Sequence, residues 1–172
     1  MGFADVETVQ RVELFMNDFN LKPEKRIVVT PAREAAKEAM EQDRGNEGIY
    51  CGAAIQLKDG TIIKGNNSPL MHAASSVVIH ALKHLADIPG KIKLLPTNIT
   101  DSIRKLKTEI LDETNVSLDV DEALIALSIS ATTNPAAELA LDKLKELQNC
   151  EIHMTHIPTP GDEAGLRRMG VN

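Results

Sequence analysis

The chain has 172 residues and a formal net charge of −6, and 42% of its residues are hydrophobic while only 2% are aromatic. This length suits one domain or one large part of a longer protein, and its hydrophobic residues suffice for a single aliphatic core. Nucleic-acid binding is disfavoured, because phosphate backbones select clustered Lys and Arg and unpaired bases select aromatic platforms.

Membrane insertion and secretion are also disfavoured. No apolar run approaches the ~20 residues that cross a bilayer, and the polar, acidic start at residues 1–5 is unlike a signal peptide. We therefore expect a cytoplasmic protein that binds neither nucleic acid nor membrane. Cys51 and Cys150 fall in different predicted strands. A disulfide would need these strands to be neighbours, and we expect two buried, reduced thiols.

The predicted elements begin with helices. Apolar residues recur at helical spacing over 5–19, where Asp5 can cap the first turn. The β-branched run 27–29 predicts a short strand. Pro31, after a capping Thr30, predicts a second helix over 31–42.

A hairpin follows, with strands over 49–57 and 61–64 joined at Asp59-Gly60, both of which tolerate positive φ. A glycine-asparagine corner at 65–68 then opens into a long helix over 69–85. Ser68 is its predicted cap, and Pro69 suits its first turn.

The second half of the chain predicts a strand over 91–95 and helices over 101–111, 120–132, 135–147 and 162–169, with a strand over 150–157. Asp119 and Glu122 form a capping box for the helix over 120–132. That helix is apolar nearly all round, which predicts a buried position at the centre of the core.

Strands that alternate with helices predict an α/β fold. We expect a mixed sheet of about four to five strands, including the hairpin, flanked by helices in layers. Residues 1–47 are expected to form an N-terminal helical segment that packs on a main α/β domain of residues 48–172.

The corner after the hairpin is the first candidate ligand site. Gly65, Asn66, Asn67 and Ser68 precede a helix whose free amides can bind an anion or a polar metabolite. The second polar helix junction, Thr133-Asn134, would complete this site if it lay nearby. The alternative is a capped helix whose preceding turn is closed by asparagine side chains.

His80 and His84 lie one helical turn apart and are the candidate metal ligands, with His153 and His156 as further ligands if their strand abuts the helix. The alternative is a solvated helix face. The acidic run 119–122 also offers clustered carboxylates to a metal, but capping accounts for two of them. No cofactor is predicted, and no complete catalytic triad is present, so the residues leave open whether the chain is an enzyme.

The order of hairpin, corner and helix also looks like the opening of the cytidine-deaminase fold. In that fold a His or Cys, an Ala and a Glu open the helix, and Pro-Cys-x-x-Cys completes a zinc site. Here His72-Ala73-Ala74 stands in that place, so the acid is absent, and Cys150 lacks a second cysteine at the required spacing. A deaminase-like architecture without the zinc motif is therefore a further alternative.

Five longer runs occur in the same order in a family of bacterial proteins. They are Asp59-Gly60-Thr61-Ile62-Ile63-Lys64-Gly65, Ala81-Leu82-Lys83-His84-Leu85-Ala86-Asp87-Ile88-Pro89, Asp121-Glu122-Ala123-Leu124-Ile125-Ala126-Leu127-Ser128-Ile129-Ser130-Ala131, Thr133-Asn134-Pro135 and Cys150-Glu151-Ile152-His153. From about Leu14 to Asn172 the chain resembles the C-terminal portion of the family described as domain of unknown function 1846, or uncharacterised protein family 0371.

This resemblance implies an accessory or assembly domain of a longer bacterial cytoplasmic protein. By this resemblance, family members carry a nucleotide-binding-like N-terminal part with a glycine-rich loop, and this chain has no counterpart to that loop. The expected partners are that N-terminal part and a second copy of the chain. The alternative function, argued from the residues alone, is a small-molecule or anion-binding enzyme domain with its site at Gly65–Ser68.

Overall fold

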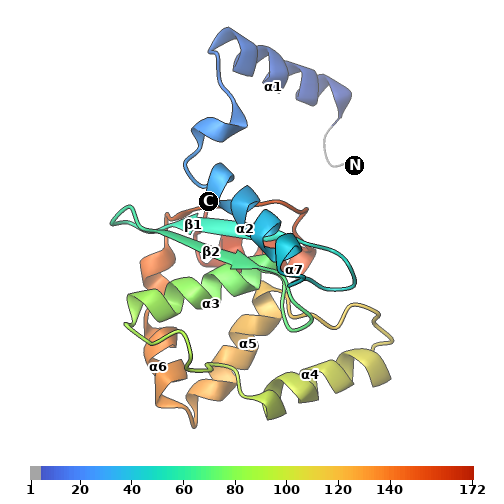
Figure 1. Ribbon diagram of the computed structural model, residues 1–172, viewed down its shortest axis with the longest axis vertical. Coiled ribbons are helices and arrows are strands. Elements are labelled where there is room, and N and C mark those ends of the chain that lie inside the picture. Colours follow the sequence, from blue (N-terminus) through green and yellow to red (C-terminus); the bar gives the residue numbers. More distant parts are fainter. Residues whose placement is uncertain (1–4) are drawn as a thin grey trace.

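The computed structural model describes residues 5–172 (Figure 1). Residues 1–4, which contributed to the argument against a signal peptide, lie outside this range. The helices are α1 (Val6–Asp18), α2 (Val29–Glu41), α3 (Ala73–Leu85), α4 (Thr97–Glu109), α5 (Val120–Ala131), α6 (Pro135–Asp142) and α7 (Pro160–Arg168), with 3-10 turns at Pro23–Lys25 and Leu144–Leu147. The strands are β1 (Gly52–Gln56), β2 (Ile62–Asn66) and β3 (Glu151–Met154).

The described strands form one antiparallel sheet of three strands in the order β2-β1-β3. Ala53 of the central strand pairs with Gly65 on one side and with Met154 on the other. The predicted hairpin and the α/β class are confirmed. The predicted mixed sheet of four to five strands is not, because the runs 27–29 and 91–95 form no strand. Val28 and Val29 are instead buried at the start of α2, and Leu94 and Leu95 enter the core from an irregular segment.

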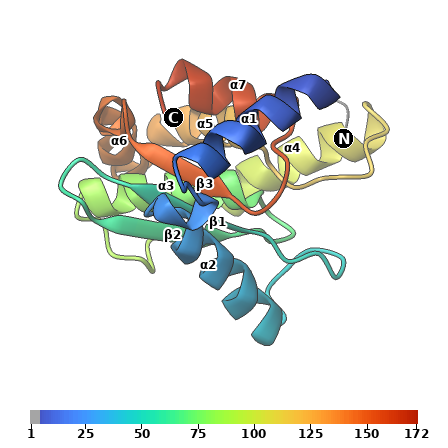
Figure 2. The ribbon, with the colours of Figure 1, turned by 90° about the horizontal axis from the view of Figure 1, so that it is seen from above.

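Helices cover both faces of the sheet, as predicted. Helix α2 packs on one face, while α3 lies on the opposite face with α5 behind it (Figures 1 and 2). Glycines allow both helices to approach closely. A Cβ at Gly52 would lie 2.1 Å from the Ala32 oxygen of α2, and one at Gly65 would lie 2.5 Å from the Val77 nitrogen of α3. The sheet and its two covering helices therefore form one tightly packed unit.

Helix α3 begins four residues later than the predicted position 69. The preceding segment pairs with the strand-like residue Leu118, which accepts a hydrogen bond from the His72 amide and donates one to the Leu70 carbonyl, each at 2.9 Å. The Ser68 hydroxyl accepts from the amides of Leu70 and Met71 and so closes a local turn. The residue at the N-cap of α3 is His72, and the prediction that Ser68 caps this helix is wrong.

Helix α5 begins as predicted, with the capping box of Asp119 and Glu122 in place. Its predicted complete burial is wrong. Val120, Ala123, Ala126 and Leu127 are among its buried residues, but Ile125 is 59% exposed and Ile129 is 49% exposed. Helix α5 packs against α3, α6 and α7 on one side and leaves an apolar face outward.

Helix α1 follows the predicted amphipathic pattern and is capped by Asp5. None of its described residues is buried, however, and Figure 1 shows it held away from the remainder of the molecule. Helix α2, by contrast, packs directly on the sheet. Across residues 5–172, no helix combines the length and the apolarity that a bilayer crossing requires.

Candidate functional site

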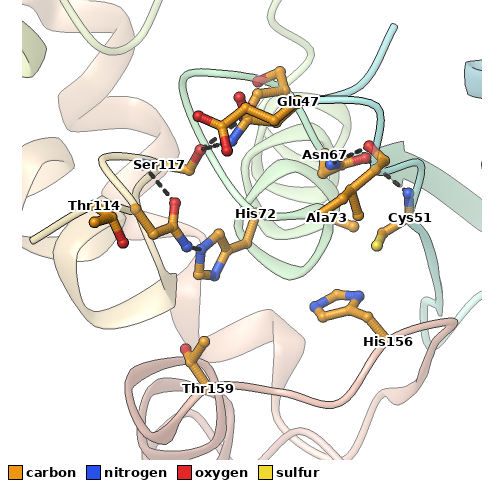
Figure 3. Close-up of a pocket in the computed structure, with 13 residues that line it drawn as sticks. Glu47, Cys51, Asn67, His72, Ala73, Thr114, Ser117, His156 and Thr159 are labelled. Carbon is orange, nitrogen blue, oxygen red and sulfur yellow. Dashed lines mark hydrogen bonds between the residues drawn. The ribbon is translucent and has the colours of Figure 1, made fainter.

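A pocket of about 360 Å³ lies where the start of α3 meets the segments that precede β1, follow β2, precede α5 and follow β3. Figure 3 shows side chains from these distant segments converging on it. Most of the residues that line the pocket are of polar type, although their apolar atoms form the larger part of its surface. Its lining residues are Asn46, Glu47, Ile49, Cys51, Asn67, Ser68, His72, Ala73, Thr114, Asn115, Ser117, His156 and Thr159.

A histidine and a buried carboxylate form one side of this pocket. His72 Nδ1 lies 2.8 Å from Asp162 Oδ2, and Asp162 has no exposed surface. The carboxylate also accepts from the Val120 amide and from the Thr159 hydroxyl. Burial raises the pKa of Asp162, but the hydrogen bonds from His72 and Thr159 outweigh it and lower this pKa below its ordinary value. Asp162 is therefore an ionised acceptor that orients the His72 ring.

The other ring nitrogen of His72 faces Asn115. The Asn115 Nδ2 atom lies 3.1 Å from His72 Nε2, while its Oδ1 atom accepts from the Ser117 amide at 3.1 Å. The Ser117 bond fixes which end of the amide faces the ring. Nδ2 is therefore the donor to Nε2, and Nδ1–H donates to Asp162. These two contacts fix the orientation of the His72 ring, with Nδ1 directed at Asp162 and Nε2 at Asn115.

His156 lies across the pocket from His72 and differs from it. Both of its ring nitrogens are buried, yet neither has a hydrogen-bond partner among the described residues. Burial lowers the pKa of His156, so the neutral form is favoured. A buried imidazole without hydrogen-bond partners is costly. A bound molecule would reduce this cost by hydrogen bonding to the ring nitrogens.

Cys51 lies beside His156 because β1 pairs with β3. Beyond the end of β3, the Thr155 amide donates to the Gly52 carbonyl at 2.9 Å. This antiparallel register brings Cys51 opposite His156, and Figure 3 shows the sulfur facing the ring. Burial raises the pKa of the Cys51 thiol, so it enters the pocket as a neutral thiol.

The loop that carries Asn115 and Ser117 is fixed by a buried lysine. Lys107 of α4 donates to the Ser117 carbonyl at 3.1 Å and to Glu122 Oε2 at 2.9 Å. Burial opposes the charge of Lys107, but Glu122 and Glu113 outweigh it and raise the pKa of this lysine. The loop is thereby tied to both α4 and α5.

The predicted ligand residues fall in different places. Asn67 and Ser68 line the pocket, with the Asn67 side chain bonded to the backbone of Cys51 and Ile49. Gly65 packs against α3 and Asn66 donates to the Arg44 carbonyl, and both residues line a separate, smaller hollow of about 130 Å³.

Thr133 and Asn134 are not among the described residues that line the pocket. Asn134 caps α6 and donates to the Lys93 carbonyl, 3.1 Å away. Thr133 and Asn134 therefore do not contribute to the pocket that Asn67 and Ser68 line.

The predicted metal ligands do not converge. His80 Nδ1 lies 2.9 Å from the Lys64 carbonyl, and His84 is exposed. No three His, Cys, Asp or Glu side chains in residues 5–172 are placed to share a metal ion. Cys51 and Cys150 are free thiols: β1 and β3 are neighbours, but the two cysteines lie at opposite ends of the pair.

Sequence reasoning missed the pairing of His72 with Asp162, and it considered His156 only as a metal ligand. His72 entered only as a residue at the position of a deaminase zinc ligand, and Asp162 only as part of a helix. One local signal was available, the Thr159-x-x-Asp162 capping box that the structure contains. Nothing in the sequence pattern connects this box with His72, which lies 90 positions away.

Known proteins match nearly the whole chain. A UPF0371 protein of Clostridium botulinum (strain Alaska E43 / Type E3) is 44% identical over 172 residues, covering 99% of this chain and 34% of the relative. A UPF0371 protein of Clostridium botulinum (strain Langeland / NCTC 10281 / Type F) is 41% identical with the same coverage. The chain thus spans about a third of the length of the curated relatives that it matches.

The family model described as "Domain of unknown function DUF1846, C-terminal" matches residues 24–172. This range contains every strand and every helix except α1. It also contains all residues of the pocket. The resemblance seen in the sequence is thereby confirmed, and the chain belongs to the DUF1846 family as its C-terminal domain.

Proposed function

We propose that this domain binds a small, uncharged polar molecule in the pocket between His72 and His156. The observation that carries the proposal is the buried His156 ring, whose two nitrogens lack partners within the described chain. A neutral imidazole offers one donor and one acceptor. The matching ligand therefore presents both kinds of group, as hydroxyl and amide compounds do.

Of the two ligand classes that the sequence suggested, an anion and a polar metabolite, the charges around the pocket favour the uncharged polar metabolite. None of the described lining residues is a lysine or an arginine, and Glu47 adds a carboxylate at the rim. The His72 ring already faces the buried Asp162 carboxylate, so it is not an uncompensated cation in this pocket. The volume of about 360 Å³ suits a molecule of the size of a pentose or a nucleobase.

His72 is the residue best placed to take part in chemistry at this site. Asp162 fixes its tautomer and orientation, which leaves Nε2 as the proton-accepting atom next to the pocket. An oriented histidine of this kind acts as a general base once a substrate hydroxyl replaces the Asn115 donor. The proposal therefore includes an enzymatic role, with His72 as the general base.

The test is a titration of the ¹⁵N-labelled chain with D-ribose and with nicotinamide, followed by NMR. We expect shifts at the backbone amides of Asn67, His72 and His156. A His156→Phe variant should lose them, whereas His84→Phe, at an exposed site on α3, should retain them. Shifts confined to other surfaces, or none with either probe, would contradict the proposal.

The second candidate function is assembly, and helix α1 favours it. Phe15 is 62% exposed and Phe19 is 69% exposed, and no described residue of α1 is buried. The occupant that we propose for this apolar face is the remainder of a longer protein, since the relatives are about three times the length of this chain. We also propose that this longer protein is cytoplasmic and that its N-terminal part resembles a nucleotide-binding unit.

Light scattering separates this partner from a second copy. If α1 packs on the remainder of a longer chain, the 172-residue chain alone should be monomeric at micromolar concentration. A dimer that a Phe15→Glu, Phe19→Glu variant dissociates would instead identify a second copy as the occupant of α1.

A further inference from the structure

Another hollow, of about 390 Å³, lies between α3, α4 and the segment that joins them. In Figure 1 this segment runs from the end of α3, beneath that helix, to the start of α4. The lining residues are Leu70, Met71, Ile79, His80, Lys83, Lys93, Leu94, Leu95, Thr97, Thr100, Asp101 and Arg104. This hollow shares no residue with the pocket at His72.

Its rim is cationic, although the chain as a whole has a net charge of −6. Lys83, Lys93 and Arg104 line it, against the single carboxylate of Asp101. Within residues 5–172, neither Lys83 nor Lys93 is part of an ion pair, and Arg104 lies 3.9 Å from Asp101. Unpaired cations that surround a cavity are positioned to bind an anion.

The start of α4 adds to this positive potential. Its N-cap is Pro96, and no side chain in the described part of the chain caps it. The first turn carries no acidic residue, and Thr97 lines the hollow. Free amides at a helix start favour negative charge.

Lys83 is the most enclosed of these cations. Its Nζ atom donates to the Gly90 carbonyl at 2.9 Å, and an ammonium group carries further donors beyond this bond. Burial lowers the pKa of Lys83. A bound anion would offset this cost and bond to the remaining donors.

The base of the hollow is apolar. Ile79, Leu94 and Leu95 line it and are buried, so the ligand should place an apolar or planar part against them. We propose that this hollow binds a small phosphate-bearing molecule whose apolar part lies on these residues. The proposal does not depend on the function inferred for the pocket at His72, and it assigns the hollow a ligand of opposite chemistry.

The experiment uses phenyl phosphate as the probe, with inorganic phosphate and phenol as the two halves of its chemistry. Binding to the ¹⁵N-labelled chain is followed by NMR shifts at Thr97, Thr100 and Ile79. We expect phenyl phosphate to bind at least about tenfold more tightly than either half, because the cationic rim and the apolar base act together.

A variant that lacks two cationic side chains of the rim is compared with a control variant of the same net charge. The Lys93→Gln, Arg104→Gln variant should weaken phenyl phosphate binding about tenfold or more. The control is Lys91→Gln, Lys105→Gln, which makes the same change in net charge at exposed residues that do not line the hollow.

Three results would overturn the proposal. One is the absence of shifts at the lining residues with millimolar phenyl phosphate. Another is equal weakening in the control variant, which would mean attraction to surface charge in general. The third is equal affinity for inorganic phosphate and phenyl phosphate, which would remove the role of the apolar base.

Discussion

At the scale of single residues, the carboxylate of Asp162 joins the starts of three helices. It lies in the first turn of α7, accepts from the first amide of α5 and orients the ring at the N-cap of α3. Each partner is a donor, so an acceptor with several lone pairs is needed. A neutral amide of the same size cannot satisfy all of them.

Asp162→Asn is therefore expected to lower the free energy of unfolding by about 1–3 kcal/mol, because buried donors lose their acceptor. Urea denaturation measures this loss. The pKa of Asp162 is lowered in the folded state, so its contribution is complete above its ordinary value of 3.8 and is lost as the pH falls through the folded value. The difference between the two proteins should shrink in that acidic range.

Asp142→Asn is the control for this change, since Asp142 is exposed at the end of α6. It should leave the free energy of unfolding within about 0.5 kcal/mol of the parent value. An equal loss in both variants would show that the contacts of Asp162 contribute little.

His156→Phe is expected to stabilise the unliganded chain, because it removes buried nitrogens that have no partner among the described residues. The pKa of His156 is lowered by burial. Stability of the parent protein is therefore lost as the pH falls from 6.5 through the folded value, since the unfolded chain binds the proton more readily. The advantage of the variant should grow over this range in thermal melts.

His153 also has a pKa lowered by burial, but it is present in both proteins and cancels from the comparison. A His156→Phe variant that is less stable than the parent at every pH would indicate that the ring fills a structural role, and the ligand proposal would lose its main support.

At the scale of the elements, short sequence patterns predicted which segments form helices better than they predicted the first residue of each helix. The capping box at Asp119 located the start of α5, because capping depends on residues only three positions apart. The start of α3 moved from 69 to 73 because pairing with Leu118 supplied partners for the intervening backbone. The run at 27–29 was wrongly predicted as a strand because helix starts also bury β-branched residues.

The candidate site was predicted only in part for the same reason. Asn67 and Ser68 follow the hairpin directly, so a local pattern pointed to them. The remaining groups come from chain segments that only the fold brings together, as His72 and Asp162 show.

The contact between β2 and α3 makes a further prediction. Gly65→Ala would place a Cβ 2.5 Å from the Val77 nitrogen and 2.8 Å from its Cα. Helix α3 would have to move, at a cost of about 1–3 kcal/mol or more. Thermal denaturation measures this loss. Gly90→Ala is the control, since a Cβ there would meet no described atom within 4 Å.

At the scale of the whole molecule, the structure divides into a packed unit and an outlying helix. Buried apolar residues extend from Val28, at the start of α2, to Val171, whereas α1 contributes no buried residue from the described range. Exposed apolar residues also occur on the outward face of α5 and on α6, at Ile125, Ile129 and Leu139.

Deletion of residues 1–19 is expected to change the stability of the remaining chain by no more than about 0.5 kcal/mol, because α1 has no buried described residue to lose. Differential scanning calorimetry of the two chains checks this expectation. A large fall in the melting temperature would mean that α1 packs on the domain in solution.

The short segment 68–72 separates the pocket at His72 from the hollow lined by Lys83 and Arg104. Ser68 and His72 line the pocket, whereas Leu70 and Met71 line the hollow. Backbone hydrogen bonds to Leu118 hold the segment in place. A ligand that displaces this segment from one side would therefore change the shape of the cavity on the other side. Thermodynamic reciprocity then requires that each occupant change the affinity of the other by the same factor.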